Sequence, residues 1–291
     1  MVGKDLLGHL GPASLLFWRF AIAASVLWAV VAIWYRRGGP DPLAIPRLTA
    51  LGLGVMFGLL VLLGFLALER LDASVYIVLV YLYPVFVVVG SVLLGARPAR
   101  GTWGALALVM IGVVLTVPEL FGGGGVESIS AVGVALTVAQ AVIFAAYMII
   151  SSRVMPSSVD GVVTAAWITL GASLVIAPMA LVGGLVVPRG RDLIVEVALF
   201  ALIPTVLSSV CFFRALRHIA PGVVAMVLTL EVALVIVWSV LFLDEDLRPI
   251  KLLGAVVVVA GVLVAQWVDT RAARAHAAAS LAMVSAVPPA G

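Results

Sequence analysis

Glu231 is the residue of this 291-residue chain whose type and position most clearly indicate chemistry. It lies near the middle of a long apolar segment, residues 221–243, where it interrupts the run TL-E-VALVIVW. A charged side chain at the centre of a membrane helix costs about 2.5–3.5 kcal/mol, so such a residue normally faces a cavity or a partner. A carboxyl group there can bind and release a proton, or it can stay protonated and only link helices by a hydrogen bond. Both interpretations make Glu231 a candidate for a polar site inside a membrane protein.

Arg19 is the second ionisable residue well inside an apolar segment, because it follows the start of residues 14–35 by five positions. Its guanidinium could bind the carboxylate of a substrate, or it could pair with Glu231. Its long aliphatic stem could equally carry the charge out to the lipid headgroups. The sequence leaves these alternatives open.

Aromatic and polar side chains inside the other segments form a further set of candidates. Tyr81 and Tyr83 lie beside Pro84, and a proline both frees a backbone carbonyl and bends its helix. Transporters use such irregular backbone near their sites, although a proline kink can also serve packing alone. Pro204 gives the same signal in a later segment. The remaining candidates for the wall of a cavity are Gln140, Tyr147 and Trp167.

Sequence patterns of several other kinds of site are missing. The chain has no P-loop, no HExxH and no GxSxG, and His9, His218 and His276 are too scattered to hold a metal. The single cysteine, Cys211, excludes a disulfide framework. The net charge of +3 arises from basic residues at the ends of apolar segments, which indicates membrane topology rather than nucleic-acid binding. We therefore expect no metal, no cofactor and no nucleic-acid partner.

The composition places these candidates in membrane helices. Hydrophobic residues make up 64% of the chain and charged residues 11%, and the mean hydropathy is +1.29. Soluble domains carry roughly 25% charged residues. The apolar runs are continuous rather than alternating, and each is close to the roughly 20 residues that cross a bilayer as a helix. The sequence thus predicts an all-α integral membrane protein with nine transmembrane helices, at residues 14–35, 48–68, 73–95, 101–121, 131–151, 161–183, 193–213, 221–243 and 250–268.

The basic residues between these segments predict the orientation. Ten arginines fall on the side that includes residues 36–47, and six lysines and arginines fall on the other side. The positive-inside rule then places the first side in the cytoplasm, with the N-terminus outside and the C-terminus inside. The Ala-rich stretch after Asp269 is predicted to be a disordered cytoplasmic tail, residues 269–291. We expect a multi-pass protein of the cytoplasmic membrane.

The two halves of the chain form a weak repeat with an offset near 148 residues. GFLALERLDAS lies over FFRALRHIAPG, and VYLYPVFVVVGSVLLGARP lies over LTLEVALVIVWSVLFLDED. The charges of the corresponding loops are opposite, which predicts that the two copies are inserted upside down relative to each other. Within this alignment Glu231 is the counterpart of Tyr83, and Trp167 is the counterpart of Arg19.

The repeats contain unequal numbers of predicted helices. The first, residues 1–121, contains four, whereas the second, residues 131–268, contains five. Inversion requires an odd number, so one helix should precede residue 14. Either the chain starts late, at an internal methionine, or the protein has nine helices.

Three stretches resemble the drug/metabolite transporter superfamily, specifically tandem EamA-type domains. They are GPASLLFWRFAIAA, YLYPVFVVVGSVLLG with GALALVMIGVVL, and TLEVALVIVWSVLFLDEDLRPIKLLGAVVVVAGVLV. The chain departs from the family at Ala96, where a glutamate is usual, and at Val232, where a proline often follows the glutamate. The resemblance implies ten helices, cytoplasmic termini, and export or exchange of amino acids, nucleosides or similar metabolites.

Together, these features predict a secondary transporter of a small metabolite, working by alternating access about a midplane cavity. Proton coupling and a homodimer are compatible with this prediction, and the lipid bilayer is the other expected partner. One alternative is a polytopic membrane enzyme acting on a lipid or isoprenoid, which should show clustered Asp, His or Arg at one membrane face. The other alternative is a truncated remnant that does not transport.

Overall fold

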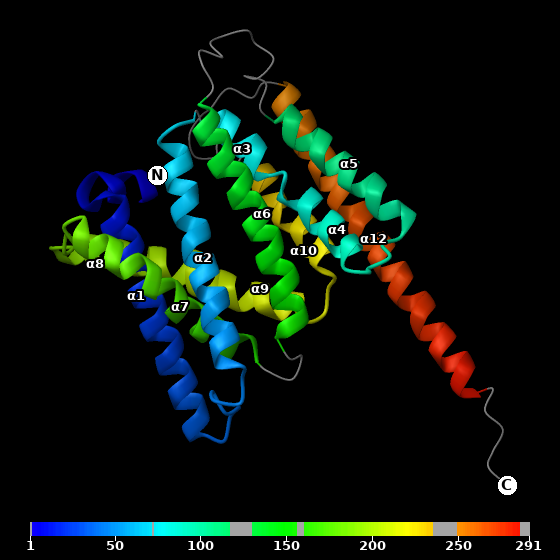
Figure 1. The fold of residues 1–291 in the computed structure, drawn as a ribbon, viewed down its shortest axis with the longest axis horizontal. Coiled ribbons are helices and arrows are strands. Elements are labelled where there is room, and N and C mark those ends of the chain that lie inside the picture. Colours follow the sequence, from blue (N-terminus) through cyan, green and yellow to red (C-terminus); the bar gives the residue numbers. More distant parts are fainter. Residues whose placement is uncertain (1, 72, 117–129, 156–159, 235–248, 286–291) are drawn as a thin grey trace. The chain divides into compact units, whose positions relative to one another are not determined.

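The computed structural model describes residues 2–71, 73–116, 130–155, 160–234 and 249–285, and every regular element in these ranges is a helix (Figure 1). Seven helices are long and apolar enough to cross a membrane, and two shorter apolar helices accompany them within the described residues. The seven are Ala13–Arg36, Arg47–Leu68, Val75–Leu93, Ala131–Val154, Gly161–Val182, Arg191–Leu216 and Pro249–Val268; the two shorter ones are Arg100–Leu115 and Pro221–Leu234. They fall on the nine segments expected from the sequence, which confirms the all-α membrane fold.

The helices form two compact units that cut across the two sequence repeats. Unit 1 comprises Met1–Leu71 and Ser130–Ile219, and unit 2 comprises Asp72–Ile129 and Ala220–Gly291. Each unit therefore takes helices from both halves of the chain.

Unit 1 contains α1 (Val2–Arg36), α2 (Arg47–Leu68), α6 (Ala131–Val154), α7 (Gly161–Val182), α8 (Arg191–Ala201), the π-helical segment η2 (Leu202–Leu207) and α9 (Ser208–Leu216). Helix α2 packs against both α6 and α7. Gly54 lies against Ile168 and Gly171, and Gly58 lies against Ala172. These contacts advance along both helices together, so α2 and α7 run parallel. The Gly54–Gly58 step therefore permits the close helix approach that its spacing predicts.

The first helix begins earlier than the sequence predicts. The residues before Pro12 are helical from Val2 and join the rest of α1 through a kink at Gly11. The backbone of Gly11 has φ 69° and ψ 161°, a conformation that glycine adopts without a steric penalty. Leu10, before the kink, packs with Leu15 and Val197 in a small apolar cluster. Through this contact, the short N-terminal helix before Gly11 packs against α8.

Unit 2 contains α3 (Ala73–Val80), α4 (Tyr83–Leu93), α5 (Arg100–Leu115), α10 (Pro221–Leu228) and α12 (Pro249–Ser285). Helix α5 runs antiparallel along α12, because Gly101 lies against Val268 and Gly112 lies against Gly254. Helices α4 and α10 are also antiparallel, with Gly222 against Val88. Helices α5 and α12 are counterparts in the sequence repeat, and α4 and α10 belong to the counterpart segments 73–95 and 221–243. An antiparallel arrangement is what an inverted repeat predicts for such counterparts.

Helix α12 continues to Ser285, well past Val268, which lies against Gly101 at the N-terminal end of α5. The disordered tail expected from residue 269 onwards is therefore wrong for residues 269–285, which are helical. Alanine has the highest helix propensity, and this stretch contains neither glycine nor proline. Arg271 also lies over the ring of Trp267, with its guanidinium carbon 3.7 Å from the ring centroid. Residues 286–291 lie outside the described part.

Candidate functional site

The membrane segment that carries Tyr81 and Tyr83 is interrupted in the structure. Helix α3 ends at Val80 and α4 begins at Tyr83, so a turn at residues 81–82, just before Pro84, interrupts the regular helix within the segment Val75–Leu93. Pro84 has no N–H to donate to the carbonyl of Val80. The N–H of Leu82 bonds to the carbonyl of Leu79 at 3.2 Å, which tightens the chain at the interruption. Backbone acceptors are thereby released from the helix.

A second interruption occurs at the equivalent position of the other repeat, in the segment that carries Glu231. Helix α10 ends at Leu228, Thr229 is a turn, and residues 230–234 are helical again. The N–H and the hydroxyl of Thr229 both donate to the carbonyl of Met226, at 3.2 and 2.6 Å. This frees the carbonyl of Ala225, the usual helical acceptor. With the offset of 148, Thr229 is the counterpart of Tyr81.

Tyr83 connects the two interrupted segments within unit 2. Its hydroxyl donates to the carbonyl of Ala225 at 3.0 Å, and its side chain is buried. The acceptor is the same carbonyl that Thr229 leaves free. Tyr83 thus satisfies a buried backbone group that an unbroken helix would satisfy itself.

We expect Tyr83→Phe to lower the free energy of unfolding by about 1–3 kcal/mol, because it removes the donor from a buried carbonyl. Thermal unfolding of the purified protein in detergent measures the change. Tyr35→Phe is the matched control, since Tyr35 is exposed near the end of α1. Equal unfolding temperatures for the two variants would contradict a stabilising role for the Tyr83 hydroxyl.

The side chains of Tyr81 and Glu231 lie close enough to interact electrostatically. The ring of Tyr81 lies next to that of Tyr83, with the centroids 6.1 Å apart. Tyr81 is half-buried, whereas the side chain of Glu231 is exposed, so the carboxyl group has a partner and also remains accessible. The phenol can donate to the ionised carboxylate, and the carboxyl group can release that bond when it binds a proton. Glu231, Tyr81 and Tyr83 therefore lie together at the two interruptions, beside Pro84.

The other candidates lie in unit 1. Gln140 and Tyr147 are both buried on α6. The ring of Tyr147 stacks with that of Phe212 at 6.0 Å and lies 5.6 Å from that of Phe57. Phe144 and Phe213 complete this aromatic cluster, whose members come from α2, α6 and α9. Sequence reasoning identified Tyr147 alone, because the cluster joins residues of α2, α6 and α9 that are far apart along the chain.

Arg19 contacts the π-helical segment of unit 1. Its Nε donates to the hydroxyl oxygen of Thr205 at 2.6 Å, and its Nη2 lies 3.4 Å from the carbonyl oxygen of Pro204. A pair between Arg19 and Glu231 stays a prediction, because the two residues belong to different units.

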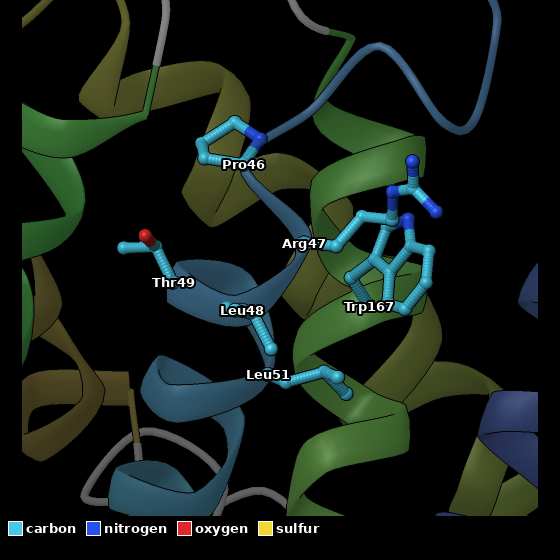
Figure 2. Close-up of a pocket in the computed structure, with 6 residues that line it drawn as sticks. All are labelled: Pro46, Arg47, Leu48, Thr49, Leu51 and Trp167. Atoms are coloured by element: carbon cyan, nitrogen blue, oxygen red, sulfur yellow. The ribbon is translucent and has the colours of Figure 1, made fainter.

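Trp167 lies at the edge of an open groove of about 600 Å³ on unit 1 (Figure 2). Its Nε1 donates to the carbonyl of Pro42 at 2.9 Å, and its ring contacts that of Trp28 edge to face. Arg47, at the start of α2, lines the same groove. Trp167 thus holds the connection between α1 and α2 in place, a role that its sequence position did not reveal.

Trp167→Phe should keep the ring packing but lose the bond to Pro42, a loss of about 1 kcal/mol. Residues 37–46, which form the connection between α1 and α2, should then be cleaved faster in limited proteolysis of the detergent-solubilised protein. Trp103→Phe serves as the control because Trp103 is exposed on α5. A cleavage rate equal to that of the control would contradict the anchoring role.

No group of three His, Cys, Asp or Glu side chains is gathered for a metal within the part of the chain that the structure describes. The two interruptions, the polar side chains at them and the apolar helices around them define a multi-pass α-helical membrane protein with discontinuous helices.

The comparisons with known proteins identify its family. The sequence pattern of the EamA-like transporter family matches residues 1–117 and 131–266, and the chain belongs to this family. The family consists of membrane transporters of small molecules. One solved structure, described as "Crystal structure of protein", is 20% identical, has a TM-score of 0.77, and is matched over 92% of this chain and 91% of its own. At this identity the likeness shows the fold alone. No curated protein matches the chain.

Proposed function

We propose that the protein is a secondary transporter that exports or exchanges a small metabolite, such as an amino acid or a similar compound, across the cytoplasmic membrane. The observation that carries the proposal is the pair of helix interruptions in unit 2, at Tyr81–Leu82 and at Thr229, with Glu231 beside them. Discontinuous membrane helices expose backbone groups at the depth of the bilayer, and secondary transporters use them to bind substrates and coupling ions. In an unbroken helix, the backbone carbonyls at these positions would all accept bonds within the helix.

In this proposal Glu231 is the group that exchanges protons. When Glu231 is ionised, the neighbouring phenol of Tyr81 can donate a hydrogen bond to it. Protonation removes the charge and weakens that bond, since bonds to charged groups are the stronger ones. Both residues lie at or next to interruptions, where the backbone lacks regular helical hydrogen bonds. A weaker contact between Tyr81 and Glu231 can therefore change the conformation of this backbone. Proton binding can then alter the geometry at which the two segments meet, which is what alternating access requires.

The proposal is tested by reconstituting the purified protein in liposomes. Liposomes loaded with a mixture of unlabelled amino acids and nucleosides are diluted into buffers that each contain one radiolabelled member. We expect at least one compound to accumulate by exchange, and we expect an imposed pH gradient to change its net uptake. Protein-free liposomes provide the background, and an ionophore that collapses the pH gradient tests the coupling. Uptake at background for every compound would overturn the proposed substrate class.

A further inference from the structure

The membrane segment Arg191–Leu216 is distorted at a defined point. Residues Leu202–Leu207 form the π-helical segment η2 between α8 and α9. Pro204 causes the distortion, because it has no N–H for the carbonyl four residues earlier and its ring clashes with that carbonyl. Single turns of π-helix inside α-helices are frequent at functional sites. The side chain that lies against this turn in unit 1 is that of Arg19.

The guanidinium of Arg19 is held in place on one edge. Its Nε and Nη2, which form the side-on fork, face the hydroxyl of Thr205 and the carbonyl of Pro204 at 2.6 and 3.4 Å. Thr205 is only 2% exposed, so this anchor lies in the interior of the unit. The rings of Phe20 and Phe200 lie 5.7 and 5.3 Å from the guanidinium carbon and stabilise the cation through their faces. Arg19 is thus a positioned cation.

These two contacts are the hydrogen bonds that Arg19 makes within the described residues. Arginine carries five N–H groups, and the two bonds to Thr205 and Pro204 use two of them. The N–H groups left on the two terminal nitrogens have the end-on geometry that binds both oxygens of a carboxylate or of a phosphate. The ion pairs Arg70–Glu69 and Arg214–Asp160 do not include Arg19. The charge inside the apolar segment is therefore not neutralised by a carboxylate of the described chain.

We infer that Arg19 binds the carboxylate of the transported metabolite, an inference that rests on the proposed function and restricts its substrate class to carboxylates. A lipid headgroup could supply the same oxyanion chemistry, since Arg19 is the seventh residue of Ala13–Arg36 and lies roughly 9 Å from its start. The bonds to Thr205 and Pro204 argue for the metabolite. They direct the guanidinium onto the π-helical turn of a neighbouring segment rather than along α1 toward the headgroups.

Binding to the detergent-solubilised full chain tests this inference. The probes are the twenty standard amino acids, acetate and succinate, each paired with its carboxamide, and the readout is the shift in thermal unfolding temperature with ligand concentration. We expect one or more carboxylates to stabilise the wild type while their amides do not. Arg19→Gln should weaken that binding about 10- to 100-fold, because a charge-assisted bidentate contact is lost. Arg189→Gln, at an exposed arginine between α7 and α8, should leave it unchanged.

Two further measurements distinguish loss of binding from misfolding, and a metabolite carboxylate from a lipid headgroup. Arg19→Lys retains the charge but not the fork, so it should fold even if Arg19→Gln does not, and its carboxylate binding should fall about tenfold. Replacing phosphatidylcholine by the anionic phosphatidylglycerol tests whether a lipid headgroup, rather than a metabolite, binds Arg19. Stabilisation by the anionic lipid alone, lost in the Arg19 variants, would overturn the inference. Equal stabilisation by carboxylates and their amides would also overturn it, and so would the absence of stabilisation by any probe. Exchange in liposomes that persists unchanged in Arg19→Lys would overturn the inference and leave the proposed function standing.

Discussion

Glu231→Gln is expected to reduce uptake driven by a pH gradient to the level of protein-free liposomes, while exchange of substrate at equal pH continues. The amide of glutamine can accept a hydrogen bond from the neighbouring Tyr81, as a carboxyl group can, but it cannot bind or release a proton. Folding should be preserved for the same reason, so the variant should elute as a single species in size-exclusion chromatography. The measurement is uptake of the identified substrate in liposomes with and without an imposed pH difference.

Two variants make this result specific. Glu196→Gln changes an exposed acid on α8, in the other unit, and should leave pH-driven uptake unaffected. Glu231→Asp retains a carboxyl group on a shorter stem and should preserve part of the coupling. If Glu231→Gln still responds normally to the pH gradient, proton coupling through this residue is wrong. If uptake and exchange weaken together, Glu231 contacts the substrate instead of carrying the proton.

Gly54→Leu is expected to prevent correct folding of unit 1. A Cβ at Gly54 would meet the carbonyl oxygen of Ile168 and the Cα of Gly171, which are backbone atoms of α7. A flexible side chain could rotate away from such a contact, but the backbone of a packed helix cannot. Overpacking of this kind costs about 1–3 kcal/mol for extra methylenes and more when the backbone must separate. We expect loss of the monodisperse peak in size-exclusion chromatography, and a lower unfolding temperature for the milder Gly54→Ala.

Gly52 provides the matched control on the same helix. It is exposed, and a Cβ there would meet nothing within 4 Å, so Gly52→Leu should change the free energy of unfolding by no more than about 0.5 kcal/mol. A Gly54→Leu protein as stable as Gly52→Leu would show that α2 and α7 do not approach each other at this glycine.

The positions of the helices follow directly from the sequence. Continuous apolar runs of membrane-spanning length can satisfy their backbone groups only within a helix, so the runs alone predict where helices occur. The irregularity at Pro84 was also predicted from a local signal, because proline lacks the N–H that a helix needs, although the sequence predicted only a bend. The break at Thr229 was not predicted. It contains no proline, and its one signal is the repeat, which places Thr229 opposite Tyr81.

The candidate site could be predicted only in part. The sequence identified Glu231, Tyr81 and Tyr83 because polar groups are costly at the centre of an apolar segment. It did not reveal that Tyr83 donates to the carbonyl of Ala225 or that Tyr81 lies next to Glu231, since both contacts depend on how two distant segments pack. The antiparallel packing of α5 on α12 agrees with the inversion inferred from the loop charges. The superposition of whole repeats stays a prediction.

The sequence by itself determined that this chain lies in a membrane, how many apolar segments it has and which few side chains can do chemistry there, because these properties depend on local composition and on the cost of burying charge. Only the tertiary structure decided the partners of those side chains. Arg19 meets Thr205 across 186 positions of the chain, and Trp167 meets Pro42 across 125. Such contacts arise where helices from both halves pack within one compact unit, and no local pattern specifies which turn of one helix will lie against which turn of another.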